Sequence, residues 1–382
     1  MKVLFTSTKG TGHARPLLPY IAELQRLGHD VHFAAPEQLR DMFEKRSIPF
    51  TPLSRVPEED VQARFAAARD MPKDEIPKWA IQEFFVRLWA GDAMQDLSAL
   101  VTEWSPDLIV RESAEFAAPI VAAKTKTPCV RVEVHNSPGE SLFIEHGAAP
   151  LDELRQSAGL PADNGKSLMT ERAFTSFPKS FDPKTDWNDR PEPFRVNSQS
   201  DVGSPSLKRP AWAPDNGQPF VYVTFGTVAG NEAEERAAYQ TALEAVGNLP
   251  INALLTTGIN MDGSLLTDIP DNVIVEAWVP QDDVFSYASA IVHHCGSGTL
   301  IGALAAGLPS IAVPLFADQP SNAEQIEKIG AGVAVFDLDV ASLQNAIMRV
   351  LDDDSFRVSS ERCAKEIAVL PTIEDAIEEM CK

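Results

Sequence analysis

One segment, Ala290–Gln325, constrains the fold more than any other part of the chain. Its sequence, AIVHHCGSGTLIGALAAGLPSIAVPLFADQPSNAEQ, is typical of a buried strand, a glycine-rich turn, a helix and a second strand. Such a βαβ unit belongs in a parallel sheet with helices on its faces. Free N–H groups at the turn and the dipole of the next helix favour a bound phosphate. We therefore predict a phosphate-binding turn, with Asp318 and Gln319 following the second strand at the same sheet edge.

Alternating strands and helices are predicted in both halves of the chain. A proline-rich stretch, 178–219, separates the two series and is predicted to be a linker. The sequence predicts two Rossmann-like domains, 1–205 and 206–382. The predicted strands of the first domain are Val3–Thr6, Val31–Ala35, 106–110 and 128–132, and those of the second are Phe220–Phe225, Ala253–Thr256, Val273–Glu276, Ala290–His293, Ser310–Pro314 and 332–336.

Composition limits the partners and the compartment. A length of 382 residues favours about two domains. The net charge of −22 disfavours binding to nucleic acid or to anionic membrane surfaces. The four cysteines show no C-x-x-C spacing, which disfavours a zinc site or a disulfide framework and fits a reducing cytoplasm. No apolar run approaches the ~18 residues that span a membrane, and the N-terminus is predicted to be a strand and not a signal peptide.

A histidine follows the first predicted strand. The loop Lys9-Gly-Thr-Gly-His13 contains only part of a dinucleotide-binding fingerprint, since Arg15 stands where the third glycine would be. It instead places His13 at the start of a helix, beyond the carboxyl end of the strand. A neutral imidazole there is suited to be a general base, and a structural hydrogen-bonding role is the alternative.

A carboxylate is predicted at the same sheet edge as His13. Strand 106–110 is followed by Arg111 and Glu112. A carboxylate at this edge can bond one ring nitrogen of His13 and leave the other free to accept a proton. The alternative for Glu112 is a surface ion pair with Arg111.

Two further motifs follow strands of the second domain. Thr224-Phe-Gly-Thr227 offers N–H and hydroxyl donors to an anion, or is an ordinary turn. Glu276-Ala-Trp-Val-Pro-Gln281 places Trp278 beside a proline, where it can form a flat wall for a nucleotide base or pack against the core.

Taken together, the motifs Gly12-His13, TFGT, WVPQ, HHCGSGT and ADQ resemble the inverting family 1 glycosyltransferases. The resemblance extends over essentially the whole chain, and it is closest to the bacterial enzymes that glycosylate polyketides and other natural products, including antibiotics. It implies an α/β protein of GT-B architecture, in which two Rossmann-like domains face each other across a cleft and the last helix packs back on the first domain. The first domain is expected to bind the acceptor, and the second is expected to bind the nucleotide-sugar donor. It also implies a metal-independent hexosyltransferase with a nucleotide-sugar cosubstrate and no other cofactor.

The resemblance also implies roles for individual residues. His13 matches the catalytic base, and Glu112 matches its acidic partner, which is more often Asp in the family. Trp278 and Val279 match the segment that contacts the nucleotide base, and Asp318 and Gln319 match the pair that binds donor-sugar hydroxyls. The residues that match the diphosphate site are Gly12, Thr227, His294, Gly296, Ser297, Gly298 and Thr299.

One departure from the family bears on the nucleotide. Relatives that use UDP-glucose usually carry a Glu in the helix after the phosphate turn, where it bonds the ribose hydroxyls. The matching residue here is Gly302, which cannot make those bonds. Since deoxyribose has one hydroxyl fewer, this favours a dTDP-sugar over a UDP-sugar.

The acceptor is predicted to be a small apolar molecule. Long loops at Val56–Trp79 and Ser137–Asp163 are expected to border its pocket. Aromatic residues that can line the pocket are Phe84, Phe85, Trp89 and Phe143. A nucleotide-sugar epimerase of the same architecture and a non-catalytic binding or auxiliary homologue stay open as alternatives, and so does a homodimer.

Overall fold

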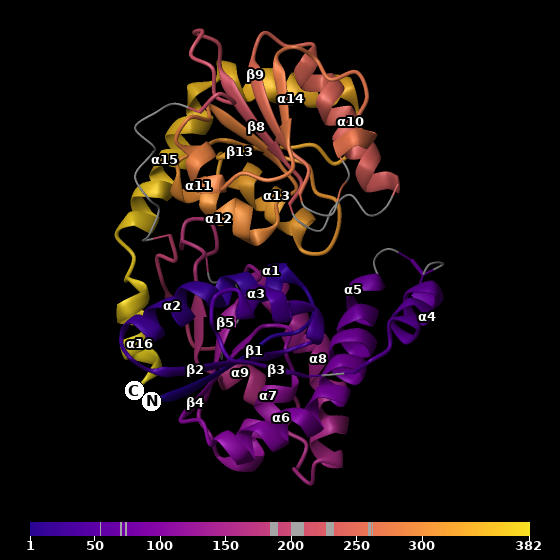
Figure 1. Cartoon of the computed structure of the whole chain (residues 1–382), viewed down its shortest axis with the longest axis vertical. Helices are drawn as coiled ribbons and strands as arrows, with labels where there is room; N and C mark the ends of the chain where they lie inside the picture. Colours follow the sequence, from indigo (N-terminus) through magenta and orange to yellow (C-terminus); the bar gives the residue numbers. More distant parts are fainter. Residues whose placement is uncertain are drawn as a thin grey trace. The chain divides into compact units, whose positions relative to one another are not determined.

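The computed structural model describes residues 1–53, 55–68, 71–72, 75–183, 190–199, 210–226, 233–258, 261 and 263–382. It divides into two compact units (Figure 1). Unit 1 comprises Met1–Ser176, Lys184–Ser198 and Pro371–Lys382, and unit 2 comprises Phe177–Pro183 and Gln199–Leu370. The predicted boundary between residues 205 and 206 lies outside the described residues.

Unit 1 is built on a parallel sheet in the order β3-β2-β1-β4-β5-β6-β7. The strand order reverses between β1 and β4, where Thr6 pairs with Arg111. The strands are β1 (Lys2–Thr6), β2 (Asp30–Ala35), β3 (Phe50–Pro52), β4 (Leu108–Glu112), β5 (Cys129–Glu133), β6 (Ala173–Thr175) and β7 (Phe194–Arg195).

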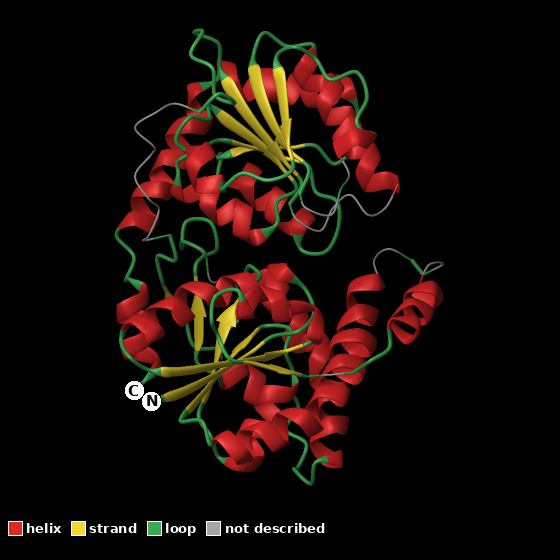
Figure 2. Ribbon diagram, in the orientation of Figure 1, coloured by secondary structure: helices red, strands yellow, loops and turns green. Residues whose placement is uncertain are grey.

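Helices cover both faces of this sheet (Figure 2). Val3 and Phe5 of β1 pack on one face with α2 and the C-terminal helix α16, while Leu4 packs on the other with α6 and α7. In Figure 1, α16 lies beside α2, and Arg26 donates to Glu374 across that contact. The helical segments are α1 (Thr11–Ala14), η1 (Arg15–Leu17), α2 (Leu18–Arg26), η2 (Glu37–Leu39), α3 (Arg40–Glu44), α4 (Glu58–Ala68), α5 (Ile76–Trp79), the π-helix η3 (Ala80–Ala90), α6 (Gly91–Trp104), α7 (Ala117–Thr125), α8 (Ser137–Ser157), α9 (Lys166–Thr170) and α16 (Ile373–Met380).

Unit 2 repeats the same topology, with a parallel sheet in the order β10-β9-β8-β11-β12-β13. The strand order reverses between β8 and β11, where Thr224 pairs with His293. The strands are β8 (Phe220–Thr224), β9 (Asn252–Thr256), β10 (Val273–Glu276), β11 (Ala290–His293), β12 (Ser310–Ala312) and β13 (Gly332–Ala334). The helices are α10 (Ala233–Gly247), η4 (Gly263–Leu265), α11 (Gln281–Phe285), α12 (Ser297–Ala305), α13 (Gln319–Lys328), α14 (Val340–Asp352) and α15 (Asp354–Ala368).

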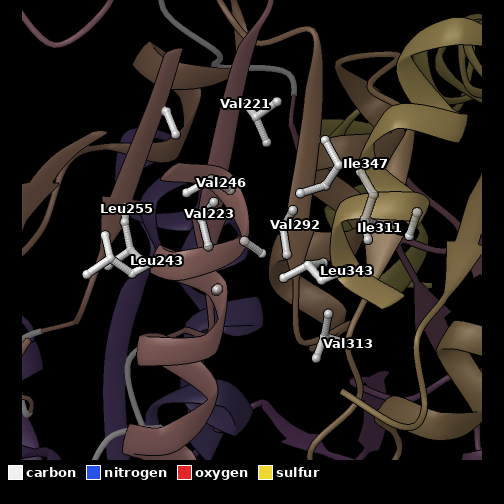
Figure 3. Packing of buried hydrophobic residues seen from close by; sticks show 14 of the residues in the cluster. Val221, Val223, Leu243, Val246, Leu255, Val292, Ile311, Val313, Leu343 and Ile347 are labelled. Carbon is white, nitrogen blue, oxygen red and sulfur yellow. The ribbon is translucent and has the colours of Figure 1, made fainter. Parts of the chain in front are cut away.

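The core of unit 2 follows the two-residue period of its strands. Val221 and Val223 of β8 pack beneath α10 and α14, as Figure 3 shows, together with Val292 of β11. Tyr222, which lies between the two valines, packs on the opposite face against Phe285 of α11. This alternation fixes the sheet register, because a shift by one residue would exchange the two faces.

The predicted α/β class with parallel sheets is confirmed, whereas several elements differ from expectation. The strands β3, β6 and β7, which are two or three residues long, were not predicted. The prediction of a loop at Ser137–Asp163 is wrong for most of that range, because Ser137–Ser157 forms helix α8. Pro138 lies in the first turn of this helix, and the side chain of the N-cap residue Asn136 accepts a hydrogen bond from the Gly139 N–H. The loop expected at Val56–Trp79 likewise contains α4 and α5.

Candidate functional site

The first group of candidate residues lies beyond the carboxyl ends of β1 and β4, where the strand order of unit 1 reverses. Ligands of open α/β sheets bind at such points. Gly10 turns the chain out of β1 at φ +123°, a conformation that favours glycine, and is the N-cap of the short helix α1. His13 lies in this helix, and its Nδ1 is 3.1 Å from Oε2 of Glu112, the last residue of β4.

Glu112 is fully buried and firmly held. Its carboxylate also accepts hydrogen bonds from the backbone N–H groups of Thr8, at 3.0 Å, and Ala114, at 2.6 Å. Burial opposes the charge of this group, but the His13 imidazole and the two N–H groups outweigh it and lower the pKa of Glu112. The carboxylate is therefore charged at neutral pH and orients the imidazole.

The alternative of an ion pair between Glu112 and Arg111 is wrong. The buried Arg111 guanidinium pairs with Glu171 instead, through bonds of 2.5 to 3.1 Å. One further nitrogen donates to the carbonyl groups of Glu112, Ser113 and Glu115. Arg111 thus stabilises the backbone around Glu112, and the Glu171 carboxylate balances the charge of the guanidinium.

An aromatic cluster from η3 and α8 reaches the His13 ring through Phe85. Phe85 lies 5.8 Å from His13 and 5.3 Å from Phe143, measured between ring centroids. Phe84 contacts Phe85 at 6.2 Å and Trp89 at 5.8 Å. The structure thus joins the four predicted acceptor-pocket residues in one chain of ring contacts, of which Phe85 reaches the imidazole, and their role in binding stays a prediction.

The second group lies beyond the carboxyl ends of β8 and β11, where the strand order of unit 2 reverses. Two consecutive histidines lie here: His293 is the last residue of β11, and His294 follows it. His293 is fully buried, and its Nδ1 accepts a hydrogen bond from the Cys295 N–H at 3.2 Å. Burial, followed by the neighbouring His294, lowers the pKa of His293 to about 3. His293 is therefore a neutral residue that shapes the turn.

His294 is enclosed by two glycines. A Cβ atom at Gly296 would lie 2.3 Å from its Nε2, and one at Gly226 would lie 2.8 Å from its Cε1. No other residue type fits at either position without moving the ring. Burial lowers the pKa of His294 to about 4, although the Asp318 carboxylate and the Thr224 backbone act in the opposite direction.

The predicted phosphate turn begins helix α12. Gly296 is its N-cap, and no side chain caps the helix there. Ser297 and Gly298 form its first turn with Thr299, whose hydroxyl lies 3.2 Å from the Gln281 side-chain nitrogen. An uncapped helix N-terminus presents N–H groups to an anion, so a bound diphosphate fits these residues.

The acidic residue after β12 is tied to this turn. Ser297 donates to the Asp318 carboxylate at 3.0 Å, and Asn322 donates to the same carboxylate at 3.2 Å and to the Cys295 carbonyl at 2.9 Å. Gln319 is buried, and its side-chain oxygen accepts from the Leu315 and Phe316 N–H groups. It therefore shapes the loop, and sugar binding by Asp318 and Gln319 stays a prediction.

Other predicted residues differ in their surroundings. Trp278 is 53% exposed and Val279 is half-buried, so the indole presents an open face. Gly302 lies in α12, packed against Phe285. Gly12 lies in α1, where a Cβ atom would have no neighbour within 4 Å. Thr227 lies outside the described residues.

Three residues beside these groups were not predicted. Gly226 lies in the TFGT motif, but its packing on His294 was not predicted, and neither were the hydrogen bonds of Asn322 to Asp318 and Cys295. His135 lies 5.7 Å from His13, and it follows β5 as Glu112 ends β4, so the rule that identified Glu112 could have found it. Within the described residues, no group of three or more His, Cys, Asp or Glu is placed to hold a metal ion. None of the described helices is long and apolar enough to cross a membrane.

Comparison with known proteins identifies the family. The model for the "Erythromycin biosynthesis protein CIII-like, N-terminal domain" matches residues 24–141, and its C-terminal counterpart matches residues 240–382. The L-demethylnoviosyl transferase of Streptomyces niveus is 30% identical over 97% of this chain and 95% of its own length. Demethyllactenocin mycarosyltransferase of Streptomyces fradiae is 27% identical over 96% of this chain and 82% of its own length.

Solved structures show the same fold. A spinosyn rhamnosyltransferase complexed with thymidine diphosphate has a TM-score of 0.83 at 22% identity, covering 100% of both chains. The same enzyme complexed with spinosyn aglycone has a TM-score of 0.84 at 21% identity, again covering 100% of both. The fold of the two units is that of GT-B glycosyltransferases, and the chain belongs to the bacterial natural-product glycosyltransferases of family 1.

Proposed function

We propose that this protein transfers a sugar, with inversion, from a dTDP-sugar to a hydroxyl group of an apolar natural-product acceptor. His13 is the general base in this proposal. The observation that carries it is the 3.1 Å contact between His13 Nδ1 and the buried, charged Glu112 carboxylate. With Nδ1–H donated to Glu112, the other ring nitrogen is the proton acceptor.

The reaction then needs one proton transfer and one displacement. His13 removes the acceptor hydroxyl proton as that oxygen forms a bond to the anomeric carbon of the sugar. The bond from this carbon to the diphosphate oxygen breaks on the opposite face, which inverts the configuration. The phenylalanines beside His13 favour an apolar acceptor and limit the access of water to the nucleophile.

The leaving diphosphate gains negative charge in the transition state. In our proposal the N–H groups at the start of α12 and the His294 ring stabilise it. Ser297 and Asp318, which are hydrogen-bonded to each other, place a carboxylate beside this turn for donor-sugar hydroxyls. The exposed Trp278 ring provides a flat surface for the nucleotide base.

Two observations favour thymidine over uridine as the nucleoside. The spinosyn rhamnosyltransferase that shares this fold is complexed with thymidine diphosphate. In this chain Gly302 offers no carboxylate for a ribose, and Phe285 fills the neighbouring space. These two observations support the choice of a dTDP-sugar as the preferred donor.

The proposal is tested by turnover of dTDP-glucose and UDP-glucose with a panel of aromatic alcohols. We expect a β-linked product from the α-linked donor, assigned by NMR, and faster turnover with dTDP-glucose. His13→Ala should lower kcat by about 10²–10⁴ with dTDP affinity almost unchanged. Full activity of this variant would refute the base, and equal use of UDP-glucose would refute the donor assignment.

A further inference from the structure

One arginine nitrogen binds three carbonyl groups of the turn that follows β4. Arg111, the residue before Glu112, has a side chain that is only 1% exposed. Its Nη1 donates to the carbonyl oxygens of Glu112, Ser113 and Glu115, at 3.0, 3.1 and 3.0 Å. Because these carbonyl groups converge on a single nitrogen, the guanidinium determines the course of the turn 112–115.

This turn carries the N–H group that fixes one oxygen of Glu112. The Ala114 N–H donates to Oε2 of Glu112 at 2.6 Å, and Oε2 is also the oxygen that lies 3.1 Å from His13 Nδ1. The other oxygen, Oε1, accepts from the Thr8 N–H. A change in the course of the turn would therefore move the Ala114 N–H, and with it the oxygen that faces the imidazole.

The guanidinium is itself held by a carboxylate. Nε and Nη2 of Arg111 both donate to Glu171, which precedes β6, at 2.5 to 3.1 Å. Burial opposes the charge of the guanidinium, but the Glu171 carboxylate outweighs burial and raises the pKa of Arg111. Burying such a pair gains little stability, since apolar residues of similar volume are often as stable or more so. Packing alone therefore does not account for the pair.

We propose that Arg111 is a positioning residue for sugar transfer. It shapes the turn 112–115, the turn fixes Oε2 of Glu112, and this oxygen orients the His13 ring. Glu171 acts one step further away, by holding the Arg111 guanidinium. The inference rests on the proposed function, in which His13 is the base. Neither Arg111 nor Glu171 is assigned a contact with either substrate.

The test compares kcat of the full-length protein in two backgrounds. Arg111→Met/Glu171→Met removes both buried charges together and should stay folded, as the melting temperature will show. It should lower kcat with dTDP-glucose and an aromatic alcohol on the order of 10- to 100-fold, because the base is misoriented. KM for dTDP-glucose should be unchanged, since the phosphate turn lies in unit 2. In a His13→Ala background the same double change should cause no further loss of kcat.

Arg111→Lys is the conservative variant, and it serves in place of the double variant if that does not fold. Its ammonium keeps the charge opposite Glu171, but its three donors cannot reproduce both the carboxylate contacts and the carbonyl contacts. It should lower kcat less than the double variant, and again only where His13 is present. The matched control is Arg172→Met/Glu379→Met, since Arg172 likewise donates to a carboxylate and a main-chain carbonyl, both of Glu379. The control should keep the wild-type kcat.

A spectroscopic measurement tests the positioning without sugar transfer. The nitrogen NMR shifts of the neutral His13 ring report its tautomer, which should be Nδ1–H in the wild type and mixed in the double variant. The inference is overturned if the variants keep the wild-type kcat, if they keep the wild-type tautomer, or if kcat falls equally in the His13→Ala background, as general structural damage would cause. If the wild type transfers no sugar, the proposed function is refuted, and the tautomer comparison alone decides the role of Arg111.

Discussion

Phe285 occupies the space beside Gly302 that a longer side chain would need. A Cβ atom at position 302, in α12, would lie 2.8 Å from Cε2 of Phe285, the last residue of α11. The glycine is therefore required by packing, and our proposal for the donor nucleotide rests on this same position.

We predict that Gly302→Glu alone will destabilise the protein without creating a useful UDP-sugar site. The new side chain must displace the Phe285 ring, and overpacking of this kind costs about 1–3 kcal/mol. Gly302→Glu combined with Phe285→Ala should make room for the carboxylate and shift the ratio of kcat/KM for UDP-glucose over dTDP-glucose upwards by about tenfold.

The control for this pair is Phe285→Ala alone, which should lower the melting temperature and leave the nucleotide preference as it is. The measurements are kcat/KM for dTDP-glucose and UDP-glucose and the melting temperature by calorimetry, for each of the three variants. A single Gly302→Glu variant with wild-type stability and a preference for UDP-glucose would show that Phe285 is no obstacle.

Glu112 is predicted to act on the reaction only through His13. Both of its oxygens accept backbone N–H groups, so the amide of Glu112→Gln leaves one of these donors without a partner, at a cost of about 1–3 kcal/mol. The variant should also lower kcat by misorienting the imidazole. In a His13→Ala background the same change should cause no further loss of kcat, whereas an additional loss would indicate an independent role for Glu112.

The positions of His13, Glu112 and His294 could be predicted because all three lie at the carboxyl ends of parallel strands. In this class of fold the ends of neighbouring strands meet at one edge, so linear order is enough to bring His13 and Glu112 together. The pairing of Arg111 with Glu171 could not be predicted, since it depends on a contact between residues 60 positions apart.

Other features depend on packing that the sequence does not display. The glycines on either side of His294 come from turns after β8 and β11, and their spacing is set by the sheet. The inward orientation of Gln319 follows from N–H groups of its own loop. Helix α8 was not predicted, and it contains two prolines: Pro138 lies in its opening turn, where proline is tolerated, and Pro150 is accommodated inside the helix.

The two glycines around the phosphate turn should respond differently to alanine. A methyl group at Gly296 meets the His294 ring at 2.3 Å, while one at Gly298 meets nothing within 4 Å. Gly296→Ala should therefore lower the melting temperature and reduce the stabilisation by dTDP, because the His294 ring must move away from the phosphate turn. Gly298→Ala should leave stability unchanged or raise it by up to about 1 kcal/mol, as helix propensity predicts. Equal melting temperatures for the two variants would contradict the enclosure of His294.

Stability is predicted to depend on pH through His293. Its pKa is about 3 in the folded protein, because of burial and the neighbouring His294, and about 6.5 in an unfolded chain. The unfolded state binds more protons between these values, so this contribution is complete above pH 6.5 and decreases as the pH falls towards 3. The expected slope is about 1.4 kcal/mol per pH unit. Chemical unfolding at pH 6.5 and pH 5 should thus differ by about 2 kcal/mol more in the wild type than in His293→Asn, whose side-chain oxygen can still accept from the Cys295 N–H without titrating. The same pH dependence in both proteins would mean that another group is responsible.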